Sequence, residues 1–77
     1  MISDRLKYTI LSELGLDEWD LVDETVAGEV PGWDSLTHVR IMSAVEVEYG
    51  ARFTTLELLR LRSVGDLQAL VDRKSSG

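Results

Sequence analysis

The sequence predicts an all-α fold, a small bundle of three main helices and one short helix with a long structured first loop. Apolar residues recur at helical spacing in separate segments, and no segment alternates apolar and polar residues as a strand would. The chain has 77 residues, the length of one small domain. We therefore expect a single domain over residues 1–77, in which residues 72–77 form a frayed polar tail.

The first predicted helix begins near residue 4 and ends at Gly15. Its apolar side chains recur every four residues, at Leu6, Ile10 and Leu14. Ser3 or Asp4 can cap the start by accepting from an unpaired backbone N–H. Gly15 stands where a left-handed C-terminal cap is favoured.

The next twenty residues show no sustained period, yet they are rich in apolar side chains. These are Leu16, Trp19, Leu21, Val22, Val26 and Val30. Loops of this length in compact domains are usually functional or held by apolar anchors. We expect this loop to be packed, with Trp19, Leu21 and either Val26 or Val30 at least partly buried.

The strongest helical pattern runs from Leu36 to Tyr49 and stops at Gly50. At about 100° per residue, one side of this helix carries Ile41, Met42, Val45 and Tyr49. The other side carries Leu36, Val39, Ser43 and Val47. Either a partner covers the second side, or the helix is buried all round.

Two further helices complete the bundle. Thr54 can cap a short helix that ends at Leu59, and Ser63 with Asp66 has the spacing of a capping box. The last helix turns four apolar residues inward, Val64, Leu67, Leu70 and Val71.

Composition narrows the classes of partner. The net charge of −6, from 14 acidic and 8 basic residues, disfavours nucleic-acid binding, which needs clustered Lys and Arg. Cysteine is absent, so disulfides and thiolate nucleophiles are excluded. The sequence has neither a signal-peptide pattern at its start nor a run of roughly 18 apolar residues. We expect a cytoplasmic monomer with no membrane partner, attracted to basic protein surfaces.

The motif search assigns no catalytic residue and no metal ligand. Acidic residues gather in the loop, at Asp17, Glu18, Asp20, Asp23 and Glu24. They lack the alternating ligands of an EF-hand, which favours a solvated loop over a weak cation site. His38 lies one turn after Ser35, but its helical direction is toward Met42 and Val45, which favours a structural histidine over a general base. No acid completes a catalytic triad.

The stretch VPGWDSLTHV, from Val30 to Val39, sets Asp34 and Ser35 directly before the strongest helix. Either side chain can cap the helix through its oxygen. The serine hydroxyl can also be held out for chemistry. The residue types by themselves leave both roles open.

The DSL triplet at Asp34, Ser35 and Leu36, followed by THVRIMSAVEVEYG, resembles the attachment motif of the acyl carrier protein family. The resemblance covers nearly the whole chain, because the helix order and RFTTLELLRLRSVGDLQALV also match. It implies that a phosphopantetheinyl transferase attaches 4'-phosphopantetheine from coenzyme A to Ser35. An acyl- or aminoacyl-loading enzyme would then charge the arm with a thioester, for ketosynthase or condensation-type enzymes to use.

The resemblance also implies that partner enzymes dock on the second helix. The implied docking residues are Leu36, Val39, Arg40, Ser43, Glu46 and Val47. Thr37, Arg40 and Val47 replace acidic residues of many fatty-acid carriers, and GWDSL differs from their usual GADSL. These departures favour a free-standing carrier of a polyketide, nonribosomal peptide or other specialised pathway.

Two other classes stay open at the level of sequence. One is an unmodified acidic helical module that only binds a protein partner, with Ser35 as a helix cap. The other is an enzyme or a metal buffer, which would require stoichiometric cation binding by the acidic loop.

Overall fold

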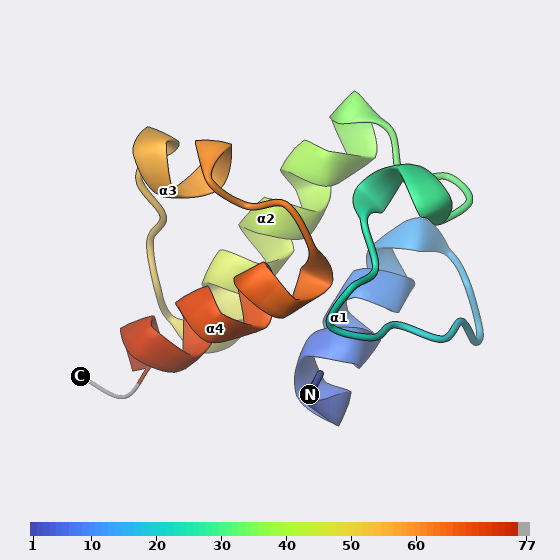
Figure 1. Ribbon diagram of the computed structural model, residues 1–77, viewed down its shortest axis with the longest axis horizontal. Coiled ribbons are helices and arrows are strands. Elements are labelled where there is room, and N and C mark those ends of the chain that lie inside the picture. The colour runs from blue at the N-terminus through green and yellow to red at the C-terminus, as the bar shows by residue number, and fades with distance from the viewer. Residues whose placement is uncertain (76–77) are drawn as a thin grey trace.

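A computed structural model describes residues 1–75. Its helices are α1 (Asp4–Leu14), a short 3-10 helix η1 (Ala27–Glu29), α2 (Ser35–Tyr49), α3 (Thr55–Leu59) and α4 (Val64–Ser75), as Figure 1 shows. No strand occurs among these 75 residues. The all-α prediction of three main helices and one short helix is therefore confirmed, and only η1 was not expected.

The glycine caps of α1 and α2 form as predicted, and Ser3 is the N-cap of α1 among the two candidates, Ser3 and Asp4. Ser3 Oγ accepts from Leu6 N–H at 3.2 Å. Gly15 and Gly50 end α1 and α2 at φ of 71° and 61°, in the left-handed region that glycine enters without steric cost. In the first turn of α1, Arg5 Nε donates to Glu48 Oε2 at 2.7 Å, and this bond connects α1 to α2.

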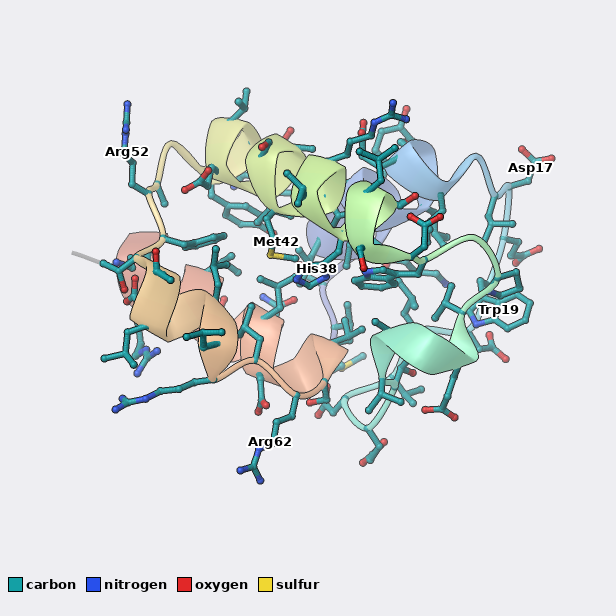
Figure 2. The ribbon with its side chains drawn as sticks, turned by 90° about the horizontal axis from the view of Figure 1, so that it is seen from above. Asp17, Trp19, His38, Met42, Arg52 and Arg62 are labelled. Atoms are coloured by element: carbon teal, nitrogen blue, oxygen red, sulfur yellow. The ribbon has the colours of Figure 1, made fainter. Side chains whose placement is uncertain are left out.

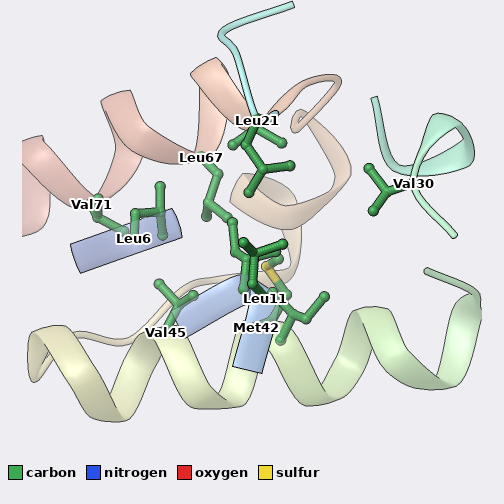
Figure 3. Packing of buried hydrophobic residues seen from close by; sticks show 11 residues of the cluster. Leu6, Leu11, Leu21, Val30, Met42, Val45, Leu67 and Val71 are labelled. Atoms are coloured by element: carbon green, nitrogen blue, oxygen red, sulfur yellow. The ribbon is translucent and has the colours of Figure 1, made fainter. Parts of the chain in front are cut away.

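The hydrophobic core lies between α1, α2 and α4 (Figure 3). The side chains that are buried most completely are Leu6, Ile10, Ile41, Val45, Leu70 and Val71. Burying one such side chain stabilises the fold by about 1.5 to 3 kcal/mol. The inward residues predicted for the last helix, Val64, Leu67, Leu70 and Val71, are all buried.

The long first loop is packed at two of its predicted anchors. Leu21 and Val30 are buried in the core, which confirms the prediction for these residues. Trp19 keeps 38% of its surface exposed and is covered only in part. Val26 is exposed, so Val30 is the anchor of that pair. Packing holds the middle and end of the loop, while the ring of Trp19 lies at its rim (Figure 2).

The loop is also fastened to the start of α4. Val64 N–H donates to Thr25 O at 2.8 Å, and Gly65 N–H donates to Asp23 O at 3.0 Å. The first N–H groups of a helix have no partner inside it, so the loop carbonyls satisfy them. This pairing sets the path of the chain toward α2.

The capping boxes of α3 and α4 differ in one bond. Thr54 and Glu57 bond each other's backbone N–H reciprocally. Bonds from Thr54 N–H and then Lys74 lower the pKa of the Glu57 carboxyl. In α4, Ser63 Oγ accepts from Asp66 N–H as predicted, but the Asp66 carboxylate accepts from Arg62 N–H.

The prediction of a frayed tail at 72–77 is wrong for residues 72–75. Helix α4 continues through Ser75. Asp72 accepts from the side chain of Gln68, one turn earlier, at 2.9 Å. Lys74 pairs with Glu57 of α3 at 2.9 Å, a contact that holds the last turn. Residues 76 and 77 lie outside the described part of the chain.

Candidate functional site

Ser35 is the first residue of α2 and its side chain is exposed. A tight turn delivers the chain to this point, with Trp33 N–H donating to Val30 O at 3.2 Å. Gly32 within this turn has φ of 82°, a conformation that favours glycine. The buried Val30 anchors the turn, so the position of Ser35 follows from packing of the loop.

Asp34, not Ser35, caps α2. Its Oδ1 accepts from Thr37 N–H at 2.9 Å. That backbone hydrogen bond favours the ionised form and lowers the pKa of the Asp34 carboxyl. The cap role that the sequence left open between the two residues therefore falls to Asp34, and the Ser35 hydroxyl is not needed to begin the helix.

Trp33 and His38 form a pair beside Ser35. Trp33 Nε1–H donates to His38 Nδ1 at 3.0 Å, and the two ring centroids are 6.1 Å apart. Nδ1 accepts this bond and is not free to take the serine proton. Figure 2 shows that His38 and Met42 point from α2 into the space toward α3 and α4. The geometry agrees with the structural histidine expected from helical direction.

Two cavities meet at this pair. An open depression of 410 Å³ is lined by Ala27, Trp33, Asp34, Ser35 and His38. A small inner cavity of 40 Å³ shares three of these residues and is otherwise lined by Met42, Leu61, Arg62, Ser63, Val64 and Leu67. Trp33 and His38 stand between the serine and the inner cavity. Sequence reasoning singled out both residues but missed their pairing, because no local pattern brings the loop ring onto the helix.

The face of α2 that turns away from the core is exposed and apolar. Leu36, Val39 and Val47 have relative exposures of 64%, 61% and 84%. Arg40 and Ser43 are exposed on the same helix. The alternative of a helix buried all round is therefore wrong. The opposite side is buried through Ile41, Met42 and Val45, as predicted.

Glu46 lies apart from this face. Its Oε2 accepts from Phe53 N–H at 2.7 Å, and the residue is half-buried. This bond holds the carboxylate against the segment between α2 and α3. Five of the six predicted docking residues are therefore exposed on α2, namely Leu36, Val39, Arg40, Ser43 and Val47. The sixth, Glu46, is bonded within the chain instead.

The acidic residues of the first loop do not gather into a cation site. Within residues 1–75, no group of three or more His, Cys, Asp or Glu side chains is arranged to hold a metal ion. Over the same residues, no helix has the length and apolarity needed to cross a bilayer. The cytoplasmic location stays a prediction from sequence.

The fold and site together define a small helical protein that presents a serine hydroxyl at the start of its second long helix. No family model matches the chain. A non-reducing polyketide synthase of Metacordyceps chlamydosporia is 37% identical over 70 residues, which are 91% of this chain and 3% of that enzyme. The chain thus spans a very small part of this curated relative.

Two further relatives match over most of their own length. An acyl carrier protein of Thermotoga maritima is 29% identical over 73 residues, or 95% of this chain and 90% of that protein. The solution structure of a holo acyl carrier protein from Geobacter metallireducens is 37% identical and superposes with a TM-score of 0.89, covering 95% of this chain and 84% of that one. This chain belongs to the acyl carrier protein family, whose members are carriers with a covalent 4'-phosphopantetheine and not enzymes.

Proposed function

We propose that Ser35 carries the 4'-phosphopantetheine arm, and that residues 1–77 are one acyl carrier domain. The arm holds acyl, polyketide or aminoacyl intermediates as thioesters and presents them to partner enzymes. The observation that carries this assignment is the exposed Ser35 hydroxyl at the first position of α2, where Asp34 already supplies the cap.

The surroundings of Ser35 fit a phosphodiester. The positive end of the dipole of α2, a helix of 15 residues, favours a negative group at its first position. The depression of 410 Å³ beside the hydroxyl is open and leaves room for the start of the arm. Because Asp34 takes the N–H of Thr37, that N–H is not available to the phosphate, and the support comes from the dipole and the open approach.

Attachment transfers the phosphopantetheinyl group of coenzyme A to the serine. The bond between Ser35 Oγ and phosphorus forms while the pyrophosphate bond of coenzyme A breaks, and the nucleotide part leaves. The hydroxyl proton passes to a base of the transferase, since His38 Nδ1 is occupied by Trp33. This chain contributes an accessible and correctly placed nucleophile.

The apolar face of α2 supplies the contact with partner enzymes. Leu36, Val39 and Val47 run along the helix from Ser35, with Arg40 and Ser43 beside them. Exposed apolar side chains contribute little to folding, whereas anchors of this kind dominate binding energies. We infer that the phosphopantetheinyl transferase, the loading enzyme and ketosynthase or condensation-type enzymes share this face.

A specialised biosynthetic pathway fits the motif best. The GWDSL sequence and the Thr37, Arg40 and Val47 positions differ from those of many fatty-acid carriers. The match with a part of a polyketide synthase is consistent with a polyketide cargo.

Intact mass after incubation with coenzyme A, magnesium and a promiscuous transferase tests the assignment. We expect the mass to rise by one phosphopantetheine in the wild type and in Ser12→Ala, and to stay unchanged in Ser35→Ala. Ser12 is a matched control because it is an exposed serine of α1, outside the α2 face. Labelling of Ser35→Ala would overturn the site. An unlabelled wild type with several transferases would favour the unmodified interaction module instead.

A further inference from the structure

The charges of this chain are divided between its two halves. Residues 1–50 hold eleven of the 14 acidic residues, whereas residues 52–74 hold five of the 8 basic residues and three acidic ones. Figure 1 shows α3 and α4 together on one side of the bundle, with α1 and the acidic loop on the other. A chain of net charge −6 therefore has one basic end.

A groove of 760 Å³ lies between α3 and α4 at this basic end. Its lining combines three arginines, four apolar residues and two acidic residues. These are Glu57, Leu59, Arg60, Leu61, Arg62, Asp66, Ala69, Leu70 and Arg73. Leu70 is buried at its floor, Leu61 is half-buried, and Leu59 is exposed. The groove offers apolar contact at its base and positive charge on its walls.

The two acids of the groove are engaged within the chain. Glu57 pairs with Lys74 at 2.9 Å. The Asp66 carboxylate accepts from the backbone N–H of Arg62 at 2.9 Å. This bond does not use the Arg62 guanidinium. Arg60 and Arg62 are exposed, and Figure 2 shows the Arg62 side chain directed away from the body of the protein. These guanidinium groups can reach a partner.

We propose that the α3–α4 groove binds an acidic amphipathic segment of a partner protein. Apolar side chains of that segment rest on the exposed Leu59 and the half-buried Leu61, and its carboxylates pair with Arg60 and Arg62. Guanidinium binds carboxylate through two parallel hydrogen bonds, which gives the contact a defined orientation. The acidic half of the chain repels the same segment, so the charge division directs it to this end.

This interaction differs from docking on the α2 face in position. The groove is built by α3 and α4 and does not include Ser35. Binding of the segment therefore requires no modification of the serine, and this proposal does not depend on the assignment of Ser35 as the attachment site.

Fluorescence anisotropy with a synthetic peptide tests the proposal. The probe is a labelled peptide of about 14 residues, or four helical turns, with leucine on one face and glutamate on its flanks. We expect Arg60→Ala/Arg62→Ala to weaken its binding about fivefold, since exposed ion pairs contribute modestly. The control Arg40→Ala/Arg52→Ala removes the same charge from exposed positions that do not line the groove, and should change binding less than about twofold.

Amide chemical shifts then locate the peptide, and they should move at Leu59–Arg62 and at 69–73. Equal weakening in both double variants would show that only net charge matters and would overturn the proposal. So would a lysine version of the peptide that binds as tightly, or shifts confined to α2. Sedimentation with phosphatidylglycerol vesicles that depends on Arg60 and Arg62, with no binding of the peptide, would replace the protein segment by a lipid surface. Circular dichroism confirms that each variant is folded.

Discussion

At the scale of single residues, two side chains near Ser35 make hydrogen bonds that do not involve the serine hydroxyl. Asp34 caps α2 through Thr37 N–H, and His38 accepts the indole N–H of Trp33. Each bond satisfies a polar group near the site without using the hydroxyl. The serine is thus exposed and chemically available, while its neighbours are fixed.

Asp34 makes stability depend on pH. Its folded pKa is lowered by the Thr37 N–H bond, so ionised Asp34 stabilises the fold at pH above the ordinary carboxyl pKa of about 3.9. This contribution is lost as the pH falls through that value toward the lower folded pKa. Asparagine caps equally well but does not titrate in this range.

Urea unfolding between about pH 5 and pH 3 measures this effect. We expect the wild type to lose stability relative to Asp34→Asn as the pH is lowered, because only the wild type loses its carboxylate acceptor. Other titrating groups are common to both proteins and cancel in the difference. A difference that stays constant with pH would mean that the Thr37 bond does not favour the ionised carboxyl.

At the scale of the element, α2 does two tasks with its two sides. The buried side enters the core through Ile41 and Val45, and the exposed side places Leu36, Val39 and Val47 in solvent. The buried residues stabilise the fold, and the exposed residues are available for binding a partner. Substitutions of the same kind on the two sides should therefore separate stability from modification.

Val39→Asp should leave the melting temperature within a few degrees, because exposed positions usually change stability by about 0.5 kcal/mol or less. The same variant should be modified markedly more slowly, since it puts an unpaired charge into the transferase interface. Val45→Asp is the control, and we expect it to unfold the protein because it buries a charge in the core. If Val39→Asp unfolds as readily, Val39 belongs to the core; if it is modified at the wild-type rate, the face is not used by the transferase.

At the scale of the whole molecule, the position of Ser35 depends on how the first loop meets α4. The backbones approach closely at Gly65, where an added Cβ would lie 2.7 Å from Asp23 O. Only glycine permits this approach without a shift of backbone. The loop carbonyls that satisfy the first N–H groups of α4 are held by the same contact.

Gly65→Ala should destabilise the fold by about 1 to 3 kcal/mol through overpacking. This is opposite to the usual gain of about 1 kcal/mol when alanine replaces glycine inside a helix. Gly28→Ala serves as the control, because its Cβ would meet nothing within 4 Å. Equilibrium unfolding in urea gives both values. A Gly65→Ala protein as stable as the wild type would show that the loop can yield at Asp23.

The helices and their ends could be read from the sequence because their causes are local. Ser3, Gly15 and Thr54 act on groups within a few residues, and these contacts form wherever the segment is helical. The two-sided pattern of α2 likewise depends only on helical geometry. The DSL motif, together with the helix order, indicated the family, and the attachment of the arm to Ser35 stays a prediction.

Contacts that helical periodicity does not predict decided the rest. Which side of α2 is buried depended on where α1 and α4 pack, and the direction of Glu46 depended on the path of Phe53. The last turn of α4 is held by Lys74 against Glu57 of another helix, so a polar sequence by itself suggested fraying there. The sequence by itself determined the order of the α-helices, the glycine ends of α1 and α2 and the carrier motif, since helix order and glycine caps rest on hydrogen bonds and periodicity within one segment. Tertiary structure alone decided the Trp33–His38 pair and the α3–α4 groove, because packing brings together side chains that no local rule relates.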